Sequence, residues 1–401
     1  MNIGEIFLKL WNDSGFAAII SGFFSQFGWQ NLVMILIGCV LLYLAIGKKF
    51  EPLLLCGIAF GCILTNIPGA NMYHPQMWES FMNHEIGYGT VMLEGGLLDI
   101  FYIGVKTSLY PCLIFLGVGA MTDFGPLLSN PKSLLLGAAA QLGVFAAFFA
   151  ARATGVFDAL QAACIGIIGG ADGPTAIFLT SKLAPDLLPA IAVAAYSYMA
   201  LIPMIQPPIM RLMTTPKMRK VKMVQTRNVS KTEKIIFPIV VTLFVALLLP
   251  STTPLIGCLM LGNLLKETGV TDRLSDTVQN ALMNIVTILL STAVGATMVG
   301  TTFLRFETLL IVGLGVVAFM LSTAGGMAGG VVLYWVTGGK VNPLIGSAGV
   351  SAVPMAARVS NKEGQKYNPS NFLLMHAMGP NVAGVIGSAI AAGFLLSIFG
   401  G

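Results

Sequence analysis

Charged side chains are scarce in this 401-residue chain, since Asp, Glu, Lys and Arg make up only 10% of it while 56% is hydrophobic. A soluble domain carries roughly 25% charged residues, so we expect most of the surface to face lipid. The formal net charge is only +5, and no basic face with interleaved aromatic residues occurs. The composition therefore predicts a multi-pass membrane protein and argues against nucleic acid as a partner.

Residues that usually carry redox, metal or nucleophilic chemistry are also few. The six cysteines lie in or beside apolar runs without a CxxC pair, and we interpret them as small buried hydrophobic residues. His74, His84 and His376 are too scattered for a histidine-based metal site. No P-loop or GxSxG motif occurs. The chain therefore has no motif for hydrolysing ATP, and any energy that it uses would come from an ion gradient or from the chemistry of a partner.

Long apolar runs are what the chain has in abundance, and a spanning helix needs about 20 such residues. We predict an all-α polytopic membrane protein with about ten spanning helices, at residues 31–47, 52–68, 100–121, 133–153, 187–210, 235–250, 253–266, 279–300, 307–325 and 371–399. Segments 155–184 and 327–357 are apolar but contain glycine breaks. We predict re-entrant or broken-helix hairpins there, because non-helical backbone at membrane depth must be buried in protein or line a water-filled cavity.

One loop, 211–234, sets the predicted orientation. It holds eight basic residues and a single acid, Glu233, and such loops remain in the cytoplasm. The helix count agrees with the basic residues only if 155–184 enters and leaves on the outer side of the membrane and 327–357 does so on the inner side, which would make the two halves inverted repeats. One miscounted helix would make the repeats parallel. We therefore divide the chain into N-terminal helices with an outer loop (1–98), a first repeat (99–212), a basic connector with its helices (213–278) and a second repeat (279–401).

The two glycine-broken segments correspond at one sequence offset. The first reads GGADGPT from Gly169, and the second reads NPLIGSAGVS from Asn342. A shift of 176 residues places Gly170 on Gly346, and it also places Val118-Gly119-Ala120 on Val294-Gly295-Ala296. Paired Gly/Pro-interrupted apolar segments in two halves indicate the binding site of a transporter.

Asp172 is the main functional candidate, because an ionised carboxylate in a bilayer is costly unless it is paired or hydrated. Its neighbouring glycines and Pro174 interrupt the helix and free backbone carbonyl groups, and Thr175 adds a hydroxyl. One carboxylate among neutral oxygens suits Na⁺ or H⁺ better than a divalent cation. In the competing interpretation, Asp-Gly-Pro is a turn in which Asp172 caps the next helix.

The second segment and the residues after it supply further candidates. Asn342 and Ser351 offer neutral oxygens, Gly346 permits close backbone approach, and Asn381 follows a Gly-Pro break in the last span. Each of these could instead belong to a turn or to the core. Arg358 ends the following apolar stretch, where it could anchor at the membrane interface or bind a partner's carboxylate. Tyr196 and Tyr198 could either reach the site or pack in the core.

Both broken segments resemble the signature segments of the β subunits of the biotin-dependent, sodium-transporting decarboxylases. The segments that carry this resemblance are GGADGPT and NPLIGSAGVSAVPMAARV, and the resemblance extends over nearly the whole chain. It implies a membrane subunit that decarboxylates carboxybiotin held by a partner, consumes a proton and drives Na⁺ outward. It further implies a carboxyltransferase, a biotin carrier and a small membrane-anchored subunit as partners, with homo-oligomers in the cell membrane and no biotin attached to this chain.

The resemblance also implies roles for individual residues. Asp172 would carry Na⁺ and couple it to the proton, while Asn342, Gly346, Ser351 and Asn381 would help to form Na⁺ sites. Tyr198 would lie on the proton route and Arg358 near carboxybiotin. The alternative function is a Na⁺-coupled symporter or antiporter without biotin chemistry. A purely structural membrane anchor would leave the buried carboxylate and the paired breaks unexplained.

Overall fold

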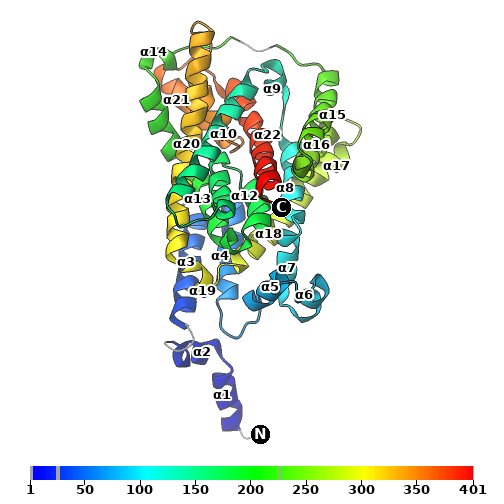
Figure 1. The fold of residues 1–401 in the computed structure, drawn as a ribbon, viewed down its shortest axis with the longest axis vertical. Coiled ribbons are helices and arrows are strands. Elements are labelled where there is room, and N and C mark those ends of the chain that lie inside the picture. The colour runs from blue at the N-terminus through cyan, green and yellow to red at the C-terminus, as the bar shows by residue number, and fades with distance from the viewer. Residues whose placement is uncertain (1–2, 24–27, 225–226, 401) are drawn as a thin grey trace.

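The computed structural model describes residues 3–23, 28–224 and 227–400, and every regular element in these ranges is helical (Figure 1). Five helices are long and apolar enough to cross a membrane: α3 (Gly28–Gly47), α10 (Ser133–Ala153), the continuous stretch Asp272–Ala296, α20 (Phe306–Val336) and α22 (Leu374–Phe399). Two bent pairs raise the number to seven, namely α7 (Leu97–Lys106) with α8 (Leu109–Met121), and Pro185–Tyr196 with Leu201–Met213. The second pair comprises the 3₁₀ turn η2 (Pro185–Leu187) and the bent helix α13 (Leu188–Met213). The prediction of an all-α polytopic membrane protein is confirmed, whereas the count of about ten spanning helices and the inverted repeats stay predictions.

The remaining helices are shorter. They are α1 (Ile3–Asn12), α2 (Gly15–Ser21), α4 (Pro52–Thr65), α5 (Pro75–Met82), α6 (Tyr88–Glu94), α9 (Gly125–Ser129), α11 (Ala159–Gly166), α12 (Gly173–Leu183), α14 (Pro216–Arg219), α15 (Lys231–Leu248), α16 (Thr253–Glu267), α17 (Asp272–Thr277), α18 (Met283–Ala296), α19 (Gly300–Phe303) and α21 (Met355–Tyr367). Short 3₁₀ turns are η1 (Ile167–Gly170), η3 (Pro250–Thr252) and η5 (Pro343–Gly349), and η4 (Val278–Leu282) is a π-helical turn.

Two stretches of the chain have a similar order of elements, although α11 of the first has no separate counterpart in the second. In the first, α10 precedes the interrupted segment α11–η1–α12 and the long helix α13. In the second, α20 precedes η5, α21 and the long helix α22. The first interruption lies within 155–184, as expected. Residues 327–336, which we assigned to the second hairpin, instead complete α20. Glycines in this stretch allow close contact with neighbouring elements without breaking the helix. Gly329 lies against Ala139 of α10, and Gly330 lies against the Pro343 backbone of η5.

Glycines permit the closest helix crossings, as expected where lipid gives little hydrophobic drive for association. A Cβ atom on Gly119 of α8 would lie 1.8 Å from the Leu259 carbonyl oxygen of α16. At the corresponding position, a Cβ atom on Gly295 of α18 would lie 2.0 Å from the Ile58 carbonyl oxygen of α4. The sequence offset of 176 therefore pairs two positions with the same packing role.

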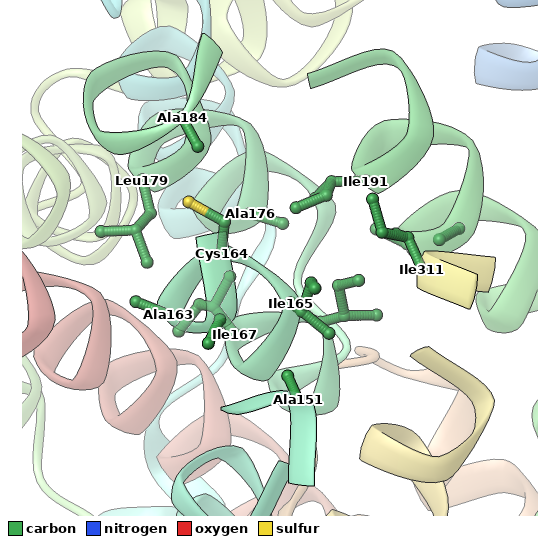
Figure 2. Packing of buried hydrophobic residues seen from close by; sticks show 14 of the residues in the cluster. Ala151, Ala163, Cys164, Ile165, Ile167, Ala176, Leu179, Ala184, Ile191 and Ile311 are labelled. Carbon is green, nitrogen blue, oxygen red and sulfur yellow. The ribbon is translucent and has the colours of Figure 1, made fainter. Parts of the chain in front are cut away.

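The core around the first interrupted segment consists largely of small and branched aliphatic side chains (Figure 2). Ala163, Cys164 and Ile165 of α11 pack there with Ala176 of α12 and Ile191 of α13. All of them are fully buried. The interpretation of the six cysteines as buried residues is correct for Cys62 and Cys164, but Cys39 is exposed and the other three are partly buried. This core surrounds the broken backbone with protein, which is the condition for keeping it at membrane depth.

We expect Gly295→Ala to destabilise the protein by about 1–3 kcal/mol, because the added methyl group must displace backbone on α4. Gly257→Ala is the matched control, since a Cβ atom there meets nothing within 4 Å. The measurement is the temperature at which each purified variant loses its monodisperse elution peak in detergent. Equal transition temperatures for the two variants would contradict the crossing geometry.

Candidate functional site

The first broken segment places a carboxylate at the start of a helix. Turn η1 ends at Ala171, whose φ of +55° lies in the left-handed region, and α12 begins at Gly173 with Pro174 in its first turn. The Asp172 carboxylate caps this helix, because Oδ1 accepts a hydrogen bond from the Thr175 backbone N–H at 3.4 Å. The capping interpretation of Asp-Gly-Pro is therefore correct. It accounts for only one of the two carboxylate oxygens.

The second oxygen joins the two broken segments. Asp172 Oδ2 accepts a hydrogen bond from the Ser351 hydroxyl at 3.0 Å. The backbones also meet directly, since the Ser351 N–H donates to the Gly170 carbonyl oxygen at 2.8 Å. Residues 179 positions apart in the sequence thus share one contact, as the paired breaks led us to expect.

A third element completes this contact. Ser388 of α22 donates its hydroxyl to Asp172 Oδ2 at 2.7 Å, which is the shortest hydrogen bond to this carboxylate. Sequence reasoning missed Ser388. The available signal was its position seven residues after Asn381, which places both residues on one face of a helix.

Asp172 is buried, with 8% of its surface exposed. Among the described residues no Lys, Arg or His side chain forms an ion pair with it. In the described part of the chain its hydrogen-bond donors are two hydroxyls and one N–H, and a membrane-buried anion with neutral donors alone remains costly. The site therefore requires a bound cation or a proton to balance the charge.

Several buried oxygens near the first broken segment have no hydrogen-bond partner in the described part of the chain. They include Gln141 Oε1, Tyr196 Oη and Ser322 Oγ. A Cβ atom on Gly170 would lie 3.7 Å from Gln141 Oε1, and one on Gly173 would lie 2.9 Å from Tyr196 Oη. Buried polar atoms in proteins nearly always have a partner. These oxygens are consistent with a hard cation that prefers oxygen ligands.

Asn381 and Gly346, which we also predicted as metal ligands, contact the backbone of neighbouring segments. Asn381 donates its amide to the carbonyl oxygens of Ala348 and Val350 at 3.1 and 2.7 Å, which holds the second broken segment against α22. Its Oδ1 atom is buried without a partner. Gly346 lies against the backbone of α20, because a Cβ atom there would lie 2.2 Å from the Gly326 carbonyl oxygen.

Asn342 lies apart from the carboxylate and connects the second segment to the basic loop. Its amide donates to the carbonyl oxygens of Arg219 and Val221 at 3.0 and 2.8 Å. Its Oδ1 accepts a hydrogen bond from the Leu344 backbone N–H at 3.0 Å. Both ends of this side chain are therefore occupied by protein in the conformation observed.

The two remaining candidates also lie outside the carboxylate cluster. The Tyr198 hydroxyl donates to the Val312 carbonyl oxygen of α20, whereas Tyr196 is the tyrosine that lies beside Gly173. Arg358 is exposed on α21, and its guanidinium has no hydrogen bond or ion pair with the described residues. No group of three or more His, Cys, Asp or Glu side chains gathers in the described ranges.

Comparisons with known proteins cover almost the entire chain. A family model described as the Na⁺-transporting oxaloacetate decarboxylase beta subunit matches residues 30–399. The glutaconyl-CoA decarboxylase subunit beta of Acidaminococcus fermentans is 58% identical, and the alignment covers 97% of this chain and 96% of that protein. The methylmalonyl-CoA decarboxylase subunit beta of Veillonella parvula is 59% identical over 96% of both chains. The oxaloacetate decarboxylase beta chain of Klebsiella pneumoniae is 52% identical over 94% of this chain and 98% of that protein.

Proposed function

The chain belongs to the family of Na⁺-transporting oxaloacetate decarboxylase beta subunits, and we propose that its buried carboxylate cluster carries Na⁺ through the membrane. It is the membrane subunit of a sodium-pumping decarboxylase. The observation that supports the proposal is that buried Asp172 has no cationic partner in the described ranges and accepts hydrogen bonds only from neutral oxygen and nitrogen groups there. Na⁺ is transported cargo in this scheme, and Asp172, Ser351 and Ser388 bind it.

The same carboxylate couples Na⁺ to a proton, because either cation neutralises it. Decarboxylation of carboxybiotin breaks the bond between a ureido nitrogen and its carboxylate carbon. It releases CO₂ and leaves a nitrogen that takes up one proton. A proton that leaves the Asp172 carboxyl toward this nitrogen recreates the anion that binds Na⁺. Tyr198 is our candidate for the proton route. Moving one charge against a membrane potential of 100 mV costs about 2.3 kcal/mol, and cleavage of the carboxybiotin bond supplies this energy.

The two broken segments form the interface at which access alternates. They meet through Ser351, Gly170 and Asp172, and inverted repeats place such tips near the membrane midplane. An inverted arrangement explains how one site can open to either side. The similar element order in α10–α13 and α20–α22 supports a repeat of this kind.

The basic loop 211–234 faces the cytoplasm in this proposal, where the carboxyltransferase and the biotin carrier act. Arg358 is then part of the docking surface for the carrier, and carboxybiotin comes from that partner. A small membrane-anchored subunit and a homo-oligomeric assembly in the cell membrane complete the complex. Relatives named for three different decarboxylation substrates share 52–59% identity with this chain. This similarity supports assigning the choice of acid to the carboxyltransferase.

Asp172→Asn is expected to abolish Na⁺ transport and Na⁺-dependent decarboxylation together, because a neutral amide needs no cation. Asp158→Asn is the matched control, since Asp158 is an exposed cap at the start of the same broken segment. The measurement combines ²²Na⁺ uptake into inverted vesicles with CO₂ release from the reconstituted complex. Na⁺-stimulated CO₂ release by Asp172→Asn would contradict the role of this carboxylate.

Ser388→Ala should raise the KM for Na⁺ roughly 10-fold, because the variant loses a hydroxyl that contacts a charged group. Ser360→Ala removes a buried hydroxyl that contacts Ser347 and the Ala356 carbonyl oxygen but not Asp172, and it should leave this constant unchanged. Initial rates of decarboxylation at varied Na⁺ measure both variants. Equal KM values would place Ser388 outside the ion site.

A further inference from the structure

Arg219, at the end of α14, is a buried charge without an acidic partner. Only 6% of its surface is exposed, although it belongs to the basic loop. Arginine stays charged in proteins, and a buried charge is costly unless polar groups or an opposite charge balance it. No Asp or Glu in the described ranges forms an ion pair with Arg219, whereas Arg211 and Arg227 of the same loop pair with glutamates. Neutral acceptors must therefore stabilise the Arg219 guanidinium.

These acceptors belong to the end of α13 and to α21, which lies beside α14 (Figure 1). Arg219 donates to the Thr214 hydroxyl at 2.8 Å, to the Arg211 carbonyl oxygen at 2.7 Å and to the Thr214 carbonyl oxygen. Carbonyl groups at a helix C-terminus lack intrahelical donors and carry the negative end of the helix dipole. Nη1 of Arg219 donates to the Tyr367 hydroxyl at 2.6 Å, and the guanidinium lies over the Tyr367 ring. The side chain therefore joins α13 to α21.

The backbone at Arg219 accepts hydrogen bonds from amide side chains. The carbonyl oxygens of Arg219 and Val221 accept from Asn342, which caps the start of η5. The Val221 carbonyl oxygen also accepts from Asn371 at 2.9 Å, in the connection between α21 and α22. We call residues 219–221 the connector segment. Its position fixes the Asn342 side chain, and the Arg219 guanidinium fixes its position.

Asn342 begins the segment that ends at the carboxylate cluster. Ser351, which donates its hydroxyl to Asp172, lies nine positions after Asn342. Between them, Gln206 of α13 donates its amide to the Ser347 carbonyl oxygen at 2.9 Å. The second broken segment is thus attached to the connector segment at one end and to the carboxylate at the other. A displacement at Asn342 has only a short path to Ser351.

We propose that Arg219 is a positioning residue for the Na⁺ site: it fixes the connector segment, which holds Asn342 and thereby keeps Ser351 in place at Asp172. The proposal rests on the function proposed above, in which Ser351 and Asp172 bind Na⁺. Arg219 acts through the second broken segment, since its guanidinium contacts α13 and Tyr367. Without Arg219, the segment holds the binding conformation for only a fraction of the time. The apparent affinity for an ion falls in proportion to that fraction.

Arg219→Gln should raise the KM for Na⁺ about 5-fold while kcat changes less than about 2-fold, because saturating Na⁺ draws the segment back into the binding conformation. Arg219→Lys keeps the charge but lacks the planar fork, so its KM should lie between the two values. Tyr367→Phe removes one acceptor and keeps the ring, and it should raise the KM by a smaller factor. Initial rates of CO₂ release by the reconstituted complex at varied Na⁺ give both constants.

Arg227→Gln is the matched control. It removes the same charge from the same loop, and Arg227 pairs with Glu233 rather than with the connector segment. Its KM for Na⁺ should equal that of the unaltered protein. A lower kcat at unchanged KM for Na⁺ in Arg219→Gln would show that Arg219 only stabilises the fold, and it would overturn the proposal. An equal rise of KM in Arg227→Gln would overturn it as well, since the charge of the loop would then set the affinity.

Amide hydrogen exchange separates this inference from the proposed function. In the full chain in lipid nanodiscs without Na⁺, the peptide that contains residues 342–351 should exchange faster in Arg219→Gln than in Arg227→Gln, because the Leu344 N–H is bonded to Asn342 Oδ1. Saturating Na⁺ should restore the slower exchange. Equal exchange in the two variants would overturn the positioning role and leave the role of Asp172 intact. Faster exchange in Arg219→Gln together with Na⁺-stimulated turnover of Asp172→Asn would show that Arg219 positions this segment while the proposed ion site fails.

Discussion

The rest of this structure depends on one constraint: the buried Asp172 carboxylate has no cationic side chain as an ion-pair partner among the described residues. Asp172 lies where two interrupted segments and the last helix meet, and only neutral groups hold it. No charged side chain among the described residues balances this anion locally, so a bound cation or a proton must. The Ser351 N–H to Gly170 carbonyl hydrogen bond fixes the two segments relative to each other. A conformational change that opens the site must therefore either break this hydrogen bond or move the two segments together.

Glycine serves two purposes in this fold. At Gly119 and Gly295, which correspond at the offset of 176, it lets a helix touch the carbonyl oxygen of its neighbour. At the breaks, the missing side chain of glycine leaves room for unpaired oxygens close to the backbone. At Gly170, for example, the nearby atom is Gln141 Oε1. The first use lets one helix of each repeat cross closely against a helix outside that repeat, α8 against α16 and α18 against α4. The second use creates a small polar interior inside an apolar shell, which a transported ion requires.

Composition and hydropathy predicted the helical membrane fold, and the glycine offset predicted that the two broken segments would meet. Asp172 and Ser351 followed from that pattern because they sit at the breaks. Ser388 did not, since a single serine in an apolar helix resembles an ordinary packed residue. The end of α20 was also predicted too early, because Gly329 and Gly330 pack closely within a continuous helix. Sequence spacing cannot distinguish a glycine that breaks a helix from one that packs against a neighbour.

Chemical modification of Asp172 tests the central claim most directly. A hydrophobic carbodiimide reacts with protonated carboxyl groups in apolar surroundings, and mass spectrometry can quantify the labelled peptide that contains Asp172. If Na⁺ and a proton compete for this carboxylate, labelling should fall as Na⁺ rises and should not respond to equal concentrations of K⁺. Labelling that is the same with and without Na⁺ would contradict the assignment of this carboxylate as the ion carrier.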